Sequence, residues 1–186
     1  MGRGRSKSSG KKSSRQSVAL KKALAGVEDK IRSELVEYAA IFDADGNKLL
    51  DKTTGQVARV SFNTSEVEKM TDAVVTHNHP SGGTFSRGDL KLMLESNMRE
   101  LRVAHADGFY SLRRNYDFGD TVPENYSKFA ADYTRAANKY KRTVSDKYAR
   151  ETLDFSGASK MWADYRHNWL AENAEKYGWT YTYGGV

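Results

Sequence analysis

Apolar positions in the first third of the chain switch between helical and strand spacing. In residues 17–33 they recur near every third or fourth position, which predicts a helix. Residues 35–42 (LVEYAAIF) form a mostly apolar run typical of a strand, and residues 43–47 (DADGN) contain the Asp-Gly pair of a hairpin turn. Residues 48–51 (KLLD) and 56–62 (QVARVSF) are predicted to be further strands.

The middle of the chain repeats this mixture of elements. Residues 63–70 (NTSEVEKM) open with the Asn-x-x-Glu pattern of a helix start. Residues 72–76 (DAVVT) predict a short strand, and another helix is expected in residues 86–96 (SRGDLKLMLES). The segments 101–106 (LRVAHA) and 109–114 (FYSLRR) flank an Asp-Gly pair and predict a hairpin.

From residue 123 onward, aromatic residues recur at helical spacing. They predict two helices that are separated by residues 153–159 (LDFSGAS) and followed by a short aromatic tail, 177–186 (YGWTYTYGGV). Such a stripe is more typical of packing than of a binding platform. The positions that set the spacing are Phe129, Tyr133, Tyr140, Val144, Trp162, Tyr165 and Trp169.

Pattern and charge together divide the chain into three parts. A tail (1–16) precedes an α/β (α+β) domain at 17–120 and a helical, aromatic-rich extension at 121–186. Residues 1–15 hold six of the 30 basic residues and no acid, and the other 24 basic residues balance the 24 acidic ones. We expect the tail to be disordered and solubilising, with weak nonspecific nucleic-acid contact through residues 3–15 as the alternative.

Composition excludes several classes of protein. The chain has 186 residues, of which 38% are hydrophobic and 29% are charged, and no apolar run reaches the roughly 18 residues of a membrane span. A secretory signal requires an apolar segment behind a basic N-terminus, and no such segment follows the basic residues here. Because cysteine is absent, disulfides, thiolate metal sites and a cysteine nucleophile are excluded. A cytoplasmic location is expected, and any metal must be held by His, Asp or Glu.

Two of the four histidines lie one residue apart at the end of a predicted central strand. Residues i and i+2 of a strand point to the same face, so His77 and His79 can present two imidazoles to one point. Pro80 ends the strand pairing, and the following glycines permit a sharp turn that returns Asp89 in the next helix. Two imidazoles and one carboxylate suit zinc, and they leave a fourth tetrahedral position for water, as in catalytic sites.

Each part of this pattern also has a purely structural explanation. Ser86 and Asp89 form an S-x-x-D helix-capping box, which is compatible with a metal site because capping fixes the turn that aims the carboxylate. The paired histidines could be exposed loop residues. His105 and His167 are expected to be surface or packing residues, and Asp72 a solvated strand end.

The segment THNHPSGGTFSRGDL, residues 76–90, resembles the JAMM (MPN+ or JAB) metalloprotease motif, H-x-H-P followed by S-x-x-D. It is especially similar to the RadC-like branch and to JAB domains of phage and mobile-element proteins. A phage-encoded protein of this kind would lie in the host cytoplasm or be associated with the virion. The resemblance covers approximately residues 34–113 and implies a cytidine-deaminase-like mixed sheet flanked by helices. Nine residues separate His79 from Asp89, one fewer than is usual in the family, so a tighter turn is expected.

The resemblance also implies roles for individual residues. His77, His79 and Asp89 match the three Zn²⁺ ligands, and Ser86 matches the serine that stabilises the oxyanion. Glu37 is the candidate for the family's general base, with Glu34 as the second candidate.

The implied activity is that of a zinc-dependent metallopeptidase or isopeptidase. Its substrate would be a protein or peptide, for example one with a ubiquitin-like C-terminus, or a phage structural protein. The alternative is a non-catalytic, nucleic-acid-associated or phage assembly protein that uses the fold as a scaffold. A metal-dependent nuclease is disfavoured, because one mononuclear site is not the usual two-metal arrangement.

Overall fold

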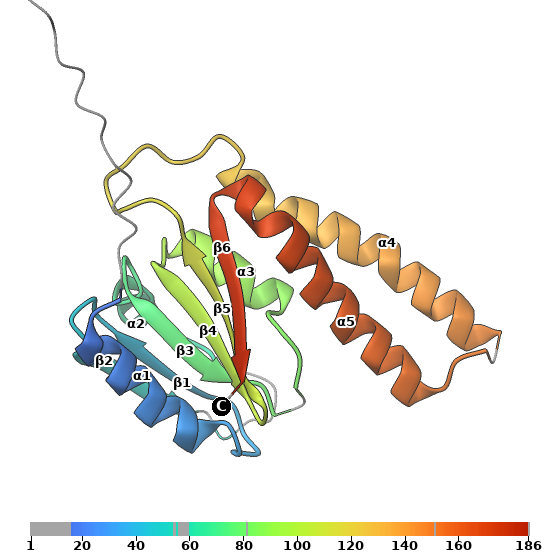
Figure 1. The fold of residues 1–186 in the computed structure, drawn as a ribbon, viewed down its shortest axis with the longest axis horizontal. Helices are drawn as coiled ribbons and strands as arrows, with labels where there is room; N and C mark the ends of the chain where they lie inside the picture. Colours follow the sequence, from blue (N-terminus) through green and yellow to red (C-terminus); the bar gives the residue numbers. More distant parts are fainter. Residues whose placement is uncertain (1–15, 54, 56–59, 81, 151, 186) are drawn as a thin grey trace, which may run out of the picture.

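The computed structural model describes residues 16–53, 55, 60–80, 82–150 and 152–185, and these include one mixed sheet (Figure 1). Its strand order is β2-β1-β3-β4-β5-β6. The β3–β4 pair is parallel and the other neighbours are antiparallel. The strands are β1 (Tyr38–Phe42), β2 (Lys48–Thr53), β3 (Val74–Asn78), β4 (Glu100–His105), β5 (Gly108–Arg114) and β6 (Trp179–Gly185).

Helices cover both faces of the sheet. They are α1 (Val18–Ile31), α2 (Thr64–Glu68), α3 (Arg87–Glu95), α4 (Phe129–Ala149) and α5 (Phe155–Asn173), with 3₁₀ turns at Tyr126–Lys128 and Ala174–Tyr177. Side chains of β3 alternate between the faces. Val74 packs with α1, whereas Val75 belongs to the core that includes α3, α4 and α5. The expected mixed α/β class is therefore confirmed.

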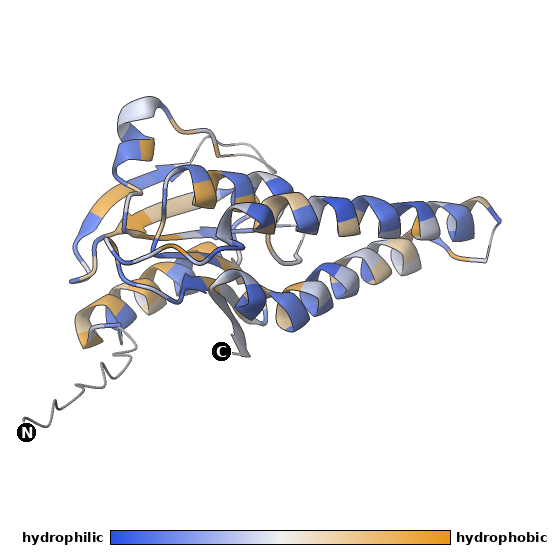
Figure 2. Cartoon of the chain, turned by 90° about the horizontal axis from the view of Figure 1, so that it is seen from above, coloured by the Kyte–Doolittle hydropathy of each residue, from blue (hydrophilic) through white to orange (hydrophobic). Residues whose placement is uncertain are grey.

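Two of the helices extend beyond the sheet. The pair α4–α5 forms a hairpin that leaves the body, and hydrophilic residues predominate in its distal half (Figure 2). Its proximal half supplies large core side chains, among them Phe129, Tyr133 and Leu170, each at most 1% exposed. The helical hairpin is thus packed on the α/β part through its proximal end.

The C-terminal segment differs from the expected aromatic tail. Residues 179–185 form β6, which pairs with β5 along its whole length, and Trp179 is fully buried. The alternation of aromatic residues with Thr180 and Thr182 is a strand pattern, because it places the rings on one face. That alternation was available in the sequence, but helical spacing in the preceding segment obscured it.

Two other predicted boundaries need correction. The first strand begins at Tyr38 rather than at residue 35, because the carbonyls of Glu34 and Val36 accept hydrogen bonds from a side chain instead of from a neighbouring strand. The strand predicted at 56–62 is absent where the structure describes it, at residues 60–62, and residues 56–59 lie outside the described part. The helix, hairpin and capping predictions at 17–33, 43–47 and 63–70 are confirmed.

A buried ionic network joins α1 to the sheet on the face opposite α3. The Arg102 guanidinium donates to both carboxylate oxygens of Glu28, at 2.6 and 2.9 Å, and to Glu100 at 2.9 Å. Uncharged side chains add further hydrogen bonds, because Thr76 donates to Glu28, while Ser111 and Gln16 donate to Glu100. The two carboxylate residues and the arginine are each at most 8% exposed. Every charge is therefore paired, as burial requires.

Replacement of Glu28 by alanine is expected to lower the free energy of unfolding by about 3–5 kcal/mol, because it leaves Arg102 buried with half of its partners. Urea denaturation measures this change. Asp29→Ala is the matched control, since Asp29 is an exposed neighbour in the same helix and pairs with Arg32 at the surface. Equal stability of the two variants would contradict the prediction.

Candidate metal centre

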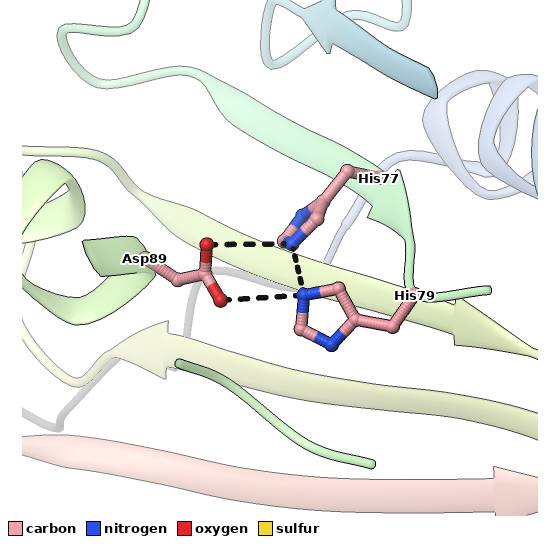
Figure 3. A group of neighbouring side chains, drawn as sticks. All are labelled: His77, His79 and Asp89. Carbon is pink, nitrogen blue, oxygen red and sulfur yellow. Dashed lines mark hydrogen bonds and ion pairs between the residues drawn. The ribbon is translucent and has the colours of Figure 1, made fainter. Parts of the chain in front are cut away.

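The strand β3 and the turn after it bring the histidine pair together (Figure 3). The Nε2 atoms of His77 and His79 lie 3.0 Å apart. The His79 backbone continues the β3–β4 pairing by donating to the Ala104 carbonyl, and its own carbonyl accepts from Gly82. Gly82 and Gly83 both have positive φ, which glycine adopts without strain. The spacing argument from the sequence therefore correctly placed the two rings side by side.

The helix α3 supplies the third side chain of the cluster. Ser86 is the N-cap of α3, and the capping box is formed in both directions. The Asp89 carboxylate accepts from the Ser86 backbone at 2.6 Å. The same carboxylate lies 3.6 Å from Nε2 of His77 and 3.4 Å from Nε2 of His79. Capping and proximity to the histidines therefore occur together, and the nine-residue connection is long enough to close the site.

The three side chains can hold one metal ion. Their ligand atoms all lie within 4.8 Å of one another. Atoms bound to one tetrahedral zinc at about 2.0–2.1 Å are separated by roughly 3.3 Å, which is close to the spacings observed. Two imidazole nitrogens that face each other at 3.0 Å also require a proton or a cation between them, because their lone pairs repel. The geometry and the donor chemistry therefore both fit a divalent cation.

The electrostatics of the cluster favour a positive charge. Burial raises the pKa of Asp89, but His77 and His79 outweigh this effect and hold that pKa well below its usual value. Burial lowers the pKa of His77, but Asp89 and Glu37 outweigh it and raise that pKa. Hydrogen bonding to the backbone of Arg102 also helps to orient the His77 ring. The Asp89 carboxylate thus stays ionised. Its charge stabilises either a proton on the histidines or a metal cation among the three side chains.

Glu37 lies on the wall of the same cavity as the cluster. This cavity has a volume of about 340 Å³ and is also lined by His77, His79, Ser86 and Asp89. Burial raises the pKa of Glu37, while the two histidines lower it, Asp89 raises it and a hydrogen bond with the Val60 backbone lowers it. The net direction is upward, so Glu37 is a stronger base than a solvated carboxylate.

The segment that carries Glu37 is held by Asn78, which lies between the two histidines in the sequence. The Asn78 side chain is fully buried. It donates to the carbonyls of Glu34 and Val36 at 3.2 and 3.0 Å and accepts from the Tyr38 backbone at 2.7 Å. The alternative base, Glu34, is exposed and lines a different cavity with Tyr38 and Lys48. The structure therefore brings Glu37, and not Glu34, to the cluster.

Side chains from the C-terminal extension support the loop between His79 and Asp89. The Tyr133 hydroxyl, on α4, donates to the Phe85 carbonyl at 3.1 Å, directly before Ser86. The Tyr181 hydroxyl, on β6, shares a hydrogen bond of 3.2 Å with Thr84. The sequence pattern predicts packing for Tyr133 and no specific role for Tyr181, because nothing local links either residue to a loop about 50–100 residues away.

Tyr133→Phe is expected to lower the free energy of unfolding by about 1–2 kcal/mol, because it leaves the buried Phe85 carbonyl without its donor. It should also weaken zinc binding several-fold, since the loop that carries Ser86 and Asp89 loses an anchor. Competition with a chromophoric chelator measures the affinity. Tyr148→Phe is the control, because it makes the same change at an exposed position of α4. Equal zinc affinity in the two variants would show that the contact does not position the loop.

The remaining polar candidates have structural partners outside the cluster. His105 stacks on Tyr110, and His167 shares a hydrogen bond of 3.0 Å with the Tyr181 hydroxyl, so both are packing residues as expected. The expectation for Asp72 was wrong. Its carboxylate accepts from Arg99 at 2.7 Å and from Arg114, because the turn before β3 places it between these two arginines.

Comparisons with known proteins found no match among models of protein families, curated proteins or solved structures. Among the described residues, no helix combines the length and the apolar character needed to cross a bilayer. The predicted nucleic-acid contact through residues 3–15 lies outside the described part of the chain.

Proposed function

We propose that this protein is a zinc-dependent metallopeptidase or isopeptidase of the JAMM type. The observation that supports this proposal is the meeting of three metal ligands and a separate carboxylate, Glu37, on one cavity. The ligand set leaves one tetrahedral position for water, which distinguishes catalytic from structural zinc sites. The cytidine-deaminase-like JAB fold belongs to the same proposal, and the mixed sheet with helices on both faces is compatible with it.

The residues of the cavity divide the chemistry between them. Zinc held by His77, His79 and Asp89 would supply Lewis-acid chemistry, because it would polarise an amide carbonyl and make a neighbouring water more acidic. Glu37 takes the proton from the attacking water and passes it to the leaving nitrogen, which needs a base with a raised pKa. The Ser86 hydroxyl accepts from the Asp89 backbone at 3.2 Å, so its own proton remains available to the developing oxyanion.

The test is hydrolysis of a panel of amides by the zinc-loaded full chain. The panel contains peptide bonds and isopeptide bonds to a lysine side chain, and each is tested with and without a chelator. We expect cleavage that the chelator abolishes and that added zinc restores. Stoichiometric zinc without cleavage of any panel member would instead favour the non-catalytic scaffold.

A further inference from the structure

The cavity beside the metal ligands has an apolar wall that the proposed chemistry does not use. Its polar lining consists of Glu37, Ser86 and the ligand cluster. The apolar lining, which we call the wall, consists of the side chains of Ala39, Val60, Phe62, Val75, Leu92 and Leu101. Water in contact with such a wall is displaced favourably by an apolar group. The wall is therefore a candidate binding subsite for an apolar group of the substrate.

The floor of this wall is fixed to the metal ligands by the sheet. Ala39 pairs with His77 across β1 and β3, and Val75 precedes His77 by two residues and so points to the same face. Leu101 pairs with Val75 across β3 and β4. These three side chains are each at most 2% exposed. The floor consequently lies next to the ligands and cannot rearrange without breaking the sheet.

The rim of the wall, Leu92 and Phe62, is less buried than the floor. Leu92 follows Asp89 by one helical turn on α3, and it is half-buried. Phe62 lies in the coil before α2, and the Lys52 ammonium group lies 5.6 Å from the centre of its ring. Lys52 also pairs with Glu66 at 2.7 Å, which ties this side of the rim to α2. Both rim residues are half-buried, so their side chains are accessible to a ligand.

The dimensions favour a single side chain as the occupant. The cavity of about 340 Å³ is at the small end of ligand pockets, which span roughly 300–1,000 Å³. Part of that space belongs to the reacting amide, so the rest suits one residue better than a folded surface.

We propose that this wall binds an apolar side chain, of leucine to phenylalanine size, on the residue that adjoins the scissile amide bond. The inference rests on the proposed function for the identity of the bond, but the pocket itself does not require turnover. Burial of a leucine side chain is expected to improve binding about ten- to a hundredfold over glycine. Polar and acidic side chains should gain nothing from the same wall.

The experiment uses amino-acid hydroxamates as probes, because a hydroxamate binds zinc directly without being hydrolysed. Calorimetry of the zinc-loaded full chain compares leucine, glycine and aspartate hydroxamates. We expect the leucine compound to bind at least about tenfold more tightly than the other two. Equal affinities of the three hydroxamates, or no binding of any of them, would contradict the proposal that the wall binds an apolar side chain.

Two variants locate the preference on the rim. Leu92→Lys is expected to reduce the leucine-to-glycine ratio to about twofold or less, because a charge then occupies the wall. Leu94→Lys makes the same change in α3 outside the cavity and should keep the ratio. Phe62→Ser, in a coil with no helix to disrupt, should also reduce it. A preference that persists in both rim variants contradicts the assignment.

The two proposals can fail separately. If the hydroxamates show the apolar preference but no amide of the panel is cleaved, the proposed function fails and the pocket stands. If amides are cleaved at equal rates whatever side chain adjoins the bond, and the hydroxamates bind equally, the pocket fails and the hydrolase stands.

Discussion

The double substitution His77→Ala/His79→Ala is expected to abolish stoichiometric zinc binding, with a loss of affinity of at least about 10³-fold. Zinc sites with four protein ligands hold about 10–16 kcal/mol, so each ligand contributes roughly 3 kcal/mol. Removal of both imidazoles leaves Asp89 as the only remaining member of the cluster. Metal analysis of purified protein and titration with a competing chelator measure the effect.

The same substitution should also remove the increase in the free energy of unfolding that zinc binding gives the wild-type protein. Zinc that binds only the folded wild-type chain stabilises it by about 4 kcal/mol at 1,000 times the dissociation constant, and it should not stabilise the variant. His105→Ala/His167→Ala is the matched control, because it removes two histidines that lie outside the cluster. The metal-site proposal would not survive if both double variants retained one zinc per chain.

Glu37→Gln is expected to lower kcat about 10²- to 10⁴-fold on whichever amide substrate the panel identifies. The amide keeps the shape and the hydrogen-bonding capacity of the side chain, but it cannot accept a proton at neutral pH. Zinc content should be unchanged, because Glu37 is not a member of the ligand cluster. A loss of kcat with unchanged zinc content would identify Glu37 as a general base and not as a metal ligand.

The alternative base is the natural control for that experiment. Glu34→Gln should behave like wild type, since Glu34 is exposed and lines a different cavity. If Glu34→Gln were the inactive variant, or if Glu37→Gln kept full activity, the assigned base would be wrong. The different behaviour of the two variants is expected because the Asn78 side chain fixes the backbone on both sides of Glu37 and so holds that residue, and not Glu34, at the cavity.

Local signals in the sequence were sufficient for two parts of the cluster, the shared face of the two histidines and the cap of α3. The alternation of side chains along a strand predicts that His77 and His79 share a face, and the S-x-x-D pattern predicts the first turn of α3. Both depend on residues only two or three positions apart, where backbone geometry leaves few alternatives. The hairpin at 43–47 and the capping box at Asn63 were predictable for the same reason.

Tertiary structure decided everything that depends on distant segments. It selected Glu37 over Glu34, because Asn78 binds the backbone around residue 37 from a position some 40 residues away. It brought Tyr133 and Tyr181 against the loop that carries Ser86, and it placed the C-terminal segment in the sheet as β6. It also created the apolar wall of the cavity, which combines three strands and a helix with the coil before α2. Contacts of this kind form only when distant segments pack together in the folded core. The spacing of residues along the chain therefore does not predict them.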